Sequence, residues 1–239
     1  MKQERYIRRN DKIEFMEKFL EIKLGITRIY LLKTSSGYIQ IDTGMKSTAD
    51  KYFKQLELLK IKPQDIQLII ASHVQSDHIG SLRILKEATS AKVLVHRLDG
   101  EALTSGKQEN VYPVTLMGKI LSKLTPDSMY VYDSVEPDIV IENDFSLSDF
   151  GINARVIHTP GPTMGSVSVI DDEGNAFIGC VAQNFPLRFF PGIPANAVDL
   201  SCVYSSWEKL VNEGVHTLHI SHGRSFNIRH LKRILKRKK

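Results

Sequence analysis

The sequence predicts a layered α/β protein in which mixed β-sheets are covered by helices. Three observations lead to this expectation. Short apolar runs of β character alternate with helical periodicity through the first half of the chain, a β-rich stretch begins at Ile139, and two helical stretches follow near the C-terminus. With 239 residues, 42% of them hydrophobic, the chain is long enough for one substantial core. We therefore expect residues 1–239 to form a single domain.

The first half of the chain is expected to open with a β-hairpin. Its strands are predicted at 29–33 and 38–41, on either side of the turn-forming residues 34–37. Ser47 and Asp50 form a capping-box-like start for the helix that follows. After that helix we expect, in order, a strand over 66–71, a polar loop over 72–78, a helix over 79–88, a strand over 92–96 and a helix over 111–124. The last of these lies in an expected helical insertion around 99–138.

The second half is expected to form a second group of strands. They are predicted at 139–141, 154–157, 166–170 and 176–179, with residues 172–175 as the turn between the last two. A helix over 200–211, a strand over 217–220 and a basic C-terminal helix over 227–239 complete the chain. Helices on the outside of mixed sheets give the layered α/β architecture.

Charge and composition restrict the classes of partner. The net charge is +5, but the C-terminal helix alone carries seven lysines and arginines, which leaves −2 for the rest. A nucleic-acid-binding protein usually has a basic face spread over the fold, so we expect no nucleic-acid partner. The sequence lacks both an apolar run of membrane-spanning length and a signal peptide, so we expect no membrane partner and a cytoplasmic location. Cys180 and Cys202 are too few for a disulfide scaffold.

The segment 72–78 contains the densest group of chemically versatile side chains. His73, Asp77 and His78 fall within six residues, in a loop that leaves the carboxyl end of a predicted strand. Open α/β folds bind their ligands in such loops. Imidazole and carboxylate groups suit zinc, manganese or iron. From these residues alone, the alternative is a polar loop whose histidines bond to backbone carbonyls.

Four further segments accompany this loop in a characteristic order. The five motifs are Asp42-Thr43-Gly44, His73-Val74-Gln75-Ser76-Asp77-His78, His158-Thr159-Pro160-Gly161-Pro162-Thr163, Gly179-Cys180 and Ser221-His222-Gly223. Together they resemble the metallo-β-lactamase superfamily over roughly residues 27–225. The resemblance implies a four-layered αβ/βα sandwich with two mixed sheets, and a metal site at the edge between the sheets.

The same resemblance implies that one of the family's two metal sites is degraded. Its ligands would be His73, Gln75 and Pro162. Proline has no ligand atom, and a glutamine amide is a weak donor compared with imidazole. We expect this site to be empty.

The second implied site keeps four residues that can bind a metal. They are Asp77, His78, Cys180 and His222. All four side chains suit zinc, and we expect one ion, most readily zinc, with manganese or iron as alternatives. Asp42 and His158 have family-like roles in orienting the ligand loop and the neighbouring strand end through hydrogen bonds.

These features predict a metal-dependent hydrolase with an activated water as the nucleophile. Asp77 or His73 would be the proton acceptor. The family suggests a small-molecule substrate such as an ester, lactone, thioester, amide or phosphoester. The alternative is a catalytically inactive member that binds a small molecule or a protein partner, with Cys180 as a packing residue. The insertion around 99–138 and the apolar loop 185–194 are expected either to line a substrate pocket or to complete a core.

Overall fold

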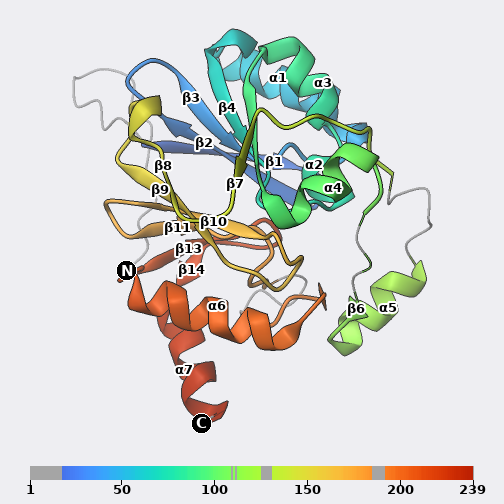
Figure 1. Cartoon of the computed structure of the whole chain (residues 1–239), viewed down its shortest axis with the longest axis vertical. Coiled ribbons are helices and arrows are strands. Elements are labelled where there is room, and N and C mark those ends of the chain that lie inside the picture. The colour runs from blue at the N-terminus through green and yellow to red at the C-terminus, as the bar shows by residue number, and fades with distance from the viewer. Residues whose placement is uncertain (1–17, 109, 111, 125–130, 185–191, 239) are drawn as a thin grey trace.

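Two six-stranded sheets packed face to face form the centre of the molecule, and helices cover their outer faces (Figure 1). The computed structural model describes residues 18–238 apart from 109, 111, 125–130 and 185–191. The expected α/β sandwich is therefore confirmed, with four layers in the order helix, sheet, sheet, helix.

The first sheet has the strand order β1-β2-β3-β4-β5-β7. The strands are β1 (Phe19–Leu24), β2 (Thr27–Lys33), β3 (Tyr38–Ile41), β4 (Ile66–Ile70), β5 (Lys92–His96) and β7 (Ile139–Ile141). The first three pair antiparallel, and β3, β4, β5 and β7 run parallel. Parallel strands place their carboxyl ends at one edge of the sheet, and the loop that carries His73 leaves from that edge.

The second sheet has the strand order β14-β13-β11-β10-β9-β8. The strands are β8 (Phe145–Ser146), β9 (Ala154–His158), β10 (Val167–Asp171), β11 (Asn175–Phe177), β13 (Thr217–His219) and β14 (Phe226–Asn227). Strands β11 and β13 are parallel neighbours, so residues that follow them emerge side by side. A separate two-stranded pair joins β6 (Tyr112–Pro113) to β12 (Asn196–Ala197).

The helices are short and lie on both outer faces. They are α1 (Ala49–Leu59), α2 (Ser76–Ile79), α3 (Leu82–Thr89), α4 (Arg97–Ser105), α5 (Leu116–Leu124), α6 (Leu200–Asn212) and α7 (Arg229–Lys238), with 3-10 turns at Lys46–Thr48, Pro63–Asp65 and Ser148–Phe150. Among the described residues, none of the helices is long and apolar enough to cross a membrane.

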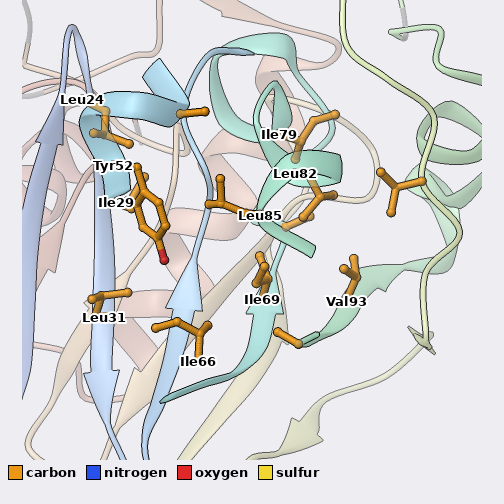
Figure 2. Close-up of a cluster of buried hydrophobic side chains, with 14 of the residues drawn as sticks. Leu24, Ile29, Leu31, Tyr52, Ile66, Ile69, Ile79, Leu82, Leu85 and Val93 are labelled. Atoms are coloured by element: carbon orange, nitrogen blue, oxygen red, sulfur yellow. The ribbon is translucent and has the colours of Figure 1, made fainter. Parts of the chain in front are cut away.

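The side chains of strand β2 pack into two apolar layers, one on each face of the sheet. Side chains alternate across a strand. Ile29 and Leu31 pack on the outer face of the sheet against α1 and α3, together with Tyr52 (Figure 2). Tyr30 and Leu32 point the other way, into the layer between the two sheets. Because both faces are buried, the sequence of the strand is an almost continuous apolar run.

The structure differs from the predicted elements in several places. Strand β1 was not predicted, although Ile22 and Leu24 are buried and alternate with exposed Glu21 and Lys23. The capping box before α1 was wrong, since the residue that precedes the helix, Thr48, makes no side-chain cap bond.

The other corrections concern helices. Residues 76–79 form the short helix α2 rather than part of a loop. The predicted helix over 111–124 begins only at Leu116, because Tyr112 and Pro113 pair with β12. The C-terminal helix begins at Arg229, whose N–H donates to the Asn227 side chain. The apolar loop 185–194, expected either to line a pocket or to complete a core, falls largely on 185–191, outside the described residues.

Candidate metal centre

Residues from four separate segments meet at the edge where the carboxyl ends of both sheets lie. His73 follows β4, and the short helix α2 carries Asp77 and His78. Cys180 and His222 follow the parallel strands β11 and β13, and the Ser221 N–H donates to the Gly179 carbonyl at 3.0 Å to hold the two strand ends together. The fold thus brings together residues that are more than 100 positions apart in sequence.

The Nε2 atom of His78 lies at the middle of this cluster. It is 3.1 Å from the Cys180 Sγ, 3.3 Å from the His222 Nε2 and 3.6 Å from the Asp77 Oδ2. The Asp77 Oδ2 is 2.9 Å from the His222 Nε2. Ligand atoms of Asp77, His78 and His222 lie within 4.8 Å of one another, as do those of His73, His78 and Cys180. Separations of this size allow one cation to reach several of the five side chains.

Hydrogen bonds outside the cluster determine which nitrogen of each imidazole faces inward. The His78 Nδ1 lies 2.7 Å from the Asp42 carboxylate, and the His222 Nδ1 lies 3.2 Å from the Ile26 carbonyl. Both partners are acceptors, so each Nδ1 carries a hydrogen and donates it. The Nε2 atoms are left to accept a proton or a metal ion, as in metal sites where an outer acceptor orients the ligand histidine.

The Nδ1 of His73 also has an outer hydrogen-bond partner, which is the hydroxyl of Ser72. The Ser72 hydroxyl donates to Asp42, so it accepts from the Nδ1–H of His73 at 2.9 Å. The Nε2 of His73 is then an acceptor, and it is buried without a hydrogen-bond partner. A buried acceptor without a partner is costly, and a cation beside it would remove that cost. The donor set therefore fits a metal ion.

Asp42 is the common anchor of this arrangement. Besides His78, its carboxylate accepts from the Ser72 N–H and hydroxyl and from the Ser221 hydroxyl. The residue has φ 63°, a left-handed conformation that aspartate adopts more readily than most residues. Burial would raise the pKa of Asp42, but His78 outweighs it and the pKa lies below its usual value. The ionised Asp42 carboxylate thus joins the side chains of Ser72, His78 and Ser221.

The cluster favours positive charge on its nitrogens and negative charge on its other ligands. Burial would lower the pKa of His222, but Cys180 and Asp77 raise it to about 10. The pKa of His78 is also raised against the effect of burial, first by Cys180 and then by Asp77. Conversely, burial would raise the pKa values of Asp77 and Cys180, but the adjacent histidines, His78 foremost, hold both well below their usual range. A site with this charge distribution attracts a metal cation, which would displace the imidazole protons.

The two residues that occupy degraded ligand positions meet each other. The Gln75 side-chain amide lies 3.5 Å from the Pro162 carbonyl oxygen, at the limit of a hydrogen bond. Neither side chain offers an imidazole, thiolate or carboxylate ligand atom. His73, which the resemblance assigns to this half of the site, has a ligand nitrogen within 4.8 Å of ligand atoms of His78 and Cys180.

His158 has a different surrounding from that of Asp42. Its Nε2 lies 2.8 Å from the Met164 carbonyl, and its ring stacks on His96 at 4.0 Å. No described contact joins it to the metal-competent side chains. The hydrogen bond of His158 therefore holds the loop after β9, and it does not orient any of the metal-competent side chains.

Sequence reasoning missed Asp99, which links two loops of the site. Its buried carboxylate accepts from the Val74 N–H at 2.9 Å, from the Thr163 hydroxyl at 2.8 Å and from the Gly165 N–H at 2.8 Å. A Cβ at position 165 would collide with Asp99, which explains the glycine there. The ligand loop and the Pro162 loop are thus held to the start of α4 by one side chain.

Comparisons with known proteins identify the family of the chain. The family model described as metallo-beta-lactamase superfamily matches residues 22–222. A probable metallo-hydrolase from Methanocaldococcus jannaschii is 30% identical over 132 residues, which cover 55% of this chain and 56% of that protein. An N-acyl homoserine lactonase from Bacillus sp is 22% identical over 210 residues, 76% of this chain and 73% of the lactonase. The chain thus matches only about half the length of the archaeal relative.

Solved structures show the same fold at low sequence identity. An archaeal metallo-beta-lactamase superfamily protein from Sulfolobus tokodaii has a TM-score of 0.63 at 23% identity, covering 92% of this chain and 85% of its own. The native FEZ-1 metallo-beta-lactamase from Legionella gormanii has a TM-score of 0.62 at 19% identity, covering 86% of this chain and 76% of its own. The family model spans most of the sequence and both sheets of the structure, and so the chain belongs to the metallo-β-lactamase superfamily.

Proposed function

We propose that this protein is a metal-dependent hydrolase that works with one ion, most readily zinc, held by Asp77, His78, Cys180 and His222. The observation that carries the proposal is the inward convergence of ligand atoms, including the Nε2 atoms of two histidines whose Nδ1 atoms are occupied by Asp42 and Ile26. When bound, such an ion would lower the pKa of a water toward about 7 and polarise a carbonyl or phosphoryl oxygen.

Solvent exposure determines which side chain of the cluster can contact an incoming water. The side chain of Asp77 is 25% exposed, whereas His78 is fully buried. Asp77 is therefore the cluster residue that can accept a hydrogen bond from an incoming water. Its lowered pKa keeps it ionised at neutral pH. His73 is buried, and its unpartnered Nε2 is the second candidate proton acceptor.

The substrate class we propose is a small ester, lactone, thioester, amide or phosphoester. The similarity to a lactonase supports a carbonyl substrate among these. With Gln75 and Pro162 in the degraded half, the transition state would be stabilised beside a single ion. We propose no nucleic-acid substrate.

Metal content tests the proposal directly. Protein purified without added metal is measured by inductively coupled plasma mass spectrometry, and the expected result is about one ion per chain. Hydrolysis is then screened with a lactone, a thioester and a phosphodiester, before and after chelation. Loss of activity on chelation with recovery on zinc addition supports the hydrolase.

The degraded ligand positions favour a second candidate, a catalytically inactive protein that binds a small molecule beside the same cluster. Essentially no metal in the purified protein, and none bound after incubation with zinc, would refute the hydrolase and favour this candidate. Stoichiometric metal with no hydrolysis of any substrate class would refute catalysis while leaving the metal site intact.

A further inference from the structure

Cys180 and His222 begin segments that run side by side at the edge of the second sheet. Cys180 follows β11 and His222 follows β13, and the two strands are parallel neighbours (Figure 1). Just before the two residues, the Ser221 N–H donates to the Gly179 carbonyl at 3.0 Å. This bond holds the segments together on the strand side of Cys180 and His222.

Asn184 holds the same segments together on the other side. Its backbone N–H donates to the His222 carbonyl at 3.2 Å. Its side-chain Nδ2 donates to the Arg224 carbonyl at 2.7 Å, and its Oδ1 accepts from the Arg224 N–H at 2.8 Å. Asn184 is 4% exposed, so these bonds replace contacts with water that the buried amide has lost. Cys180 and His222 therefore lie between two connections.

The turn that follows His222 is shaped around the Asn184 side chain. Gly223 has φ 132°, in the left-handed region that glycine adopts readily and other residues rarely. A Cβ at this position would collide with the Asn184 Oδ1. The glycine therefore lets the amide reach the backbone of Arg224 directly.

The segment that carries Cys180 has an anchor of its own. Trp207, a fully buried residue of α6, donates from its indole Nε1 to the Val181 carbonyl at 2.8 Å. This bond does not involve Asn184. Loss of the Asn184 side chain would therefore leave the Cys180 segment in place and release the turn over 222–224.

The His222 ring depends on its backbone for direction. Its Nε2 lies 2.9 Å from the Asp77 Oδ2, while its Nδ1 lies 3.2 Å from the Ile26 carbonyl, at the long end of ordinary hydrogen bonds. A movement of the turn over 222–224 would shift both nitrogen atoms. The bonds from Asn184 oppose such a movement.

We propose that Asn184 is a positioning residue for the metal centre. Its side chain holds the turn over 222–224 so that the His222 Nε2 stays directed at the same point as the other ligand atoms. Hydrogen-bonded groups that orient metal ligands typically contribute about 10- to 100-fold to metal affinity. This inference rests on the proposed function, because it takes His222 as a ligand.

Zinc affinity in a double-mutant cycle tests the proposal. It is measured by chelator competition in the parent, Asn184→Ala, His222→Ala and the double variant. Asn184→Ala should lower the affinity of the parent by about 10- to 100-fold. In the His222→Ala background the same change should lower it by less than about twofold, because the ligand that Asn184 positions is gone. A merely structural loss would be equal in both backgrounds.

Two controls separate positioning from general destabilisation. Asn175→Ala removes a side-chain bond of 2.8 Å to Asp171 at the opposite end of β11 from Cys180, and it should bind zinc like the parent. Asn184→Ala should still lower the affinity in the Cys180→Ala background, since the Cys180 segment has its own anchor. Circular dichroism establishes that each variant folds. If Asn184→Ala does not fold, Asn184→Ser, which keeps a small polar group, takes its place in the same cycle.

Two results would overturn the proposal. The first is equal zinc affinity in the parent and in Asn184→Ala. The second is an equal loss of affinity in the parent and in the His222→Ala background, which assigns Asn184 a structural role. A parent that binds no zinc would instead refute the proposed metal-dependent function, and the positioning role with it.

Discussion

Replacing Cys180 by alanine separates a metal ligand from a packing residue. The Cys180 side chain is 4% exposed and its Sγ lies 3.1 Å from the His78 Nε2. The neighbouring histidines hold its pKa well below the usual range, against the effect of burial. A thiolate in this position would be a strong ligand. Cys180→Ala removes it while leaving the other three ligands and Asp42 in place.

The expected loss can be estimated from the number of ligands. Zinc sites with four protein ligands bind with about 10–16 kcal/mol, so one ligand in four accounts for about 3–4 kcal/mol. This corresponds to about 100- to 1000-fold in affinity. Cys180→Asp should retain substantially more metal than Cys180→Ala, because a carboxylate replaces the thiolate, although its oxygen bonds are about 0.2 Å shorter than zinc–sulfur bonds.

Competition with a chromogenic chelator measures these affinities. Cys202→Ala is the matched control, since Cys202 is the other free cysteine and its thiol lies 3.5 Å from Asp199, away from the site. We expect the control to bind zinc like the parent. The reasoning fails if Cys180→Ala binds zinc as tightly as Cys202→Ala does. In that case Cys180 is a packing residue, and the proposed hydrolase has lost a principal ligand.

Three further changes test other parts of the structure. Gln75→His combined with Pro162→His should add a second ion to the one we expect in the parent; anomalous scattering that shows two ions already in the parent would contradict this. Asp99→Asn should lower the free energy of unfolding in urea by about 1–3 kcal/mol, because buried donors lose an acceptor, whereas exposed Asp149→Asn should change it by less than about 0.5 kcal/mol. Burial lowers the pKa of His219 to about 4, so the folded protein favours the neutral ring. The stability from this group is complete above about pH 6.5 and is lost as the pH falls toward 4, by about 2 kcal/mol between pH 7.5 and 5. His219→Gln should lack that part of the acid destabilisation, and an equal loss in parent and variant would refute the assignment.

The order of motifs in the sequence was sufficient to predict the superfamily and the fold. Apolar periodicity placed most strands and helices within a few residues of their positions, because a strand or helix that buries one face must repeat its apolar residues at 2 or 3.6 positions. Strand β1 was missed although its alternation is visible in the sequence. The start of α5 was misplaced because the pairing of Tyr112 and Pro113 with β12 depends on residues 80 positions away.

The sequence by itself determined which residue types occupy the ligand positions. It also showed that Gln75 and Pro162 replace two of the expected metal ligands. Only the tertiary structure decided that His73 joins the remaining cluster, and that Asp99 ties two loops of the site together. The physical reason is the same in each case. Local sequence specifies which residues share a face, whereas the partner that covers that face, or leaves it open, comes from distant parts of the chain.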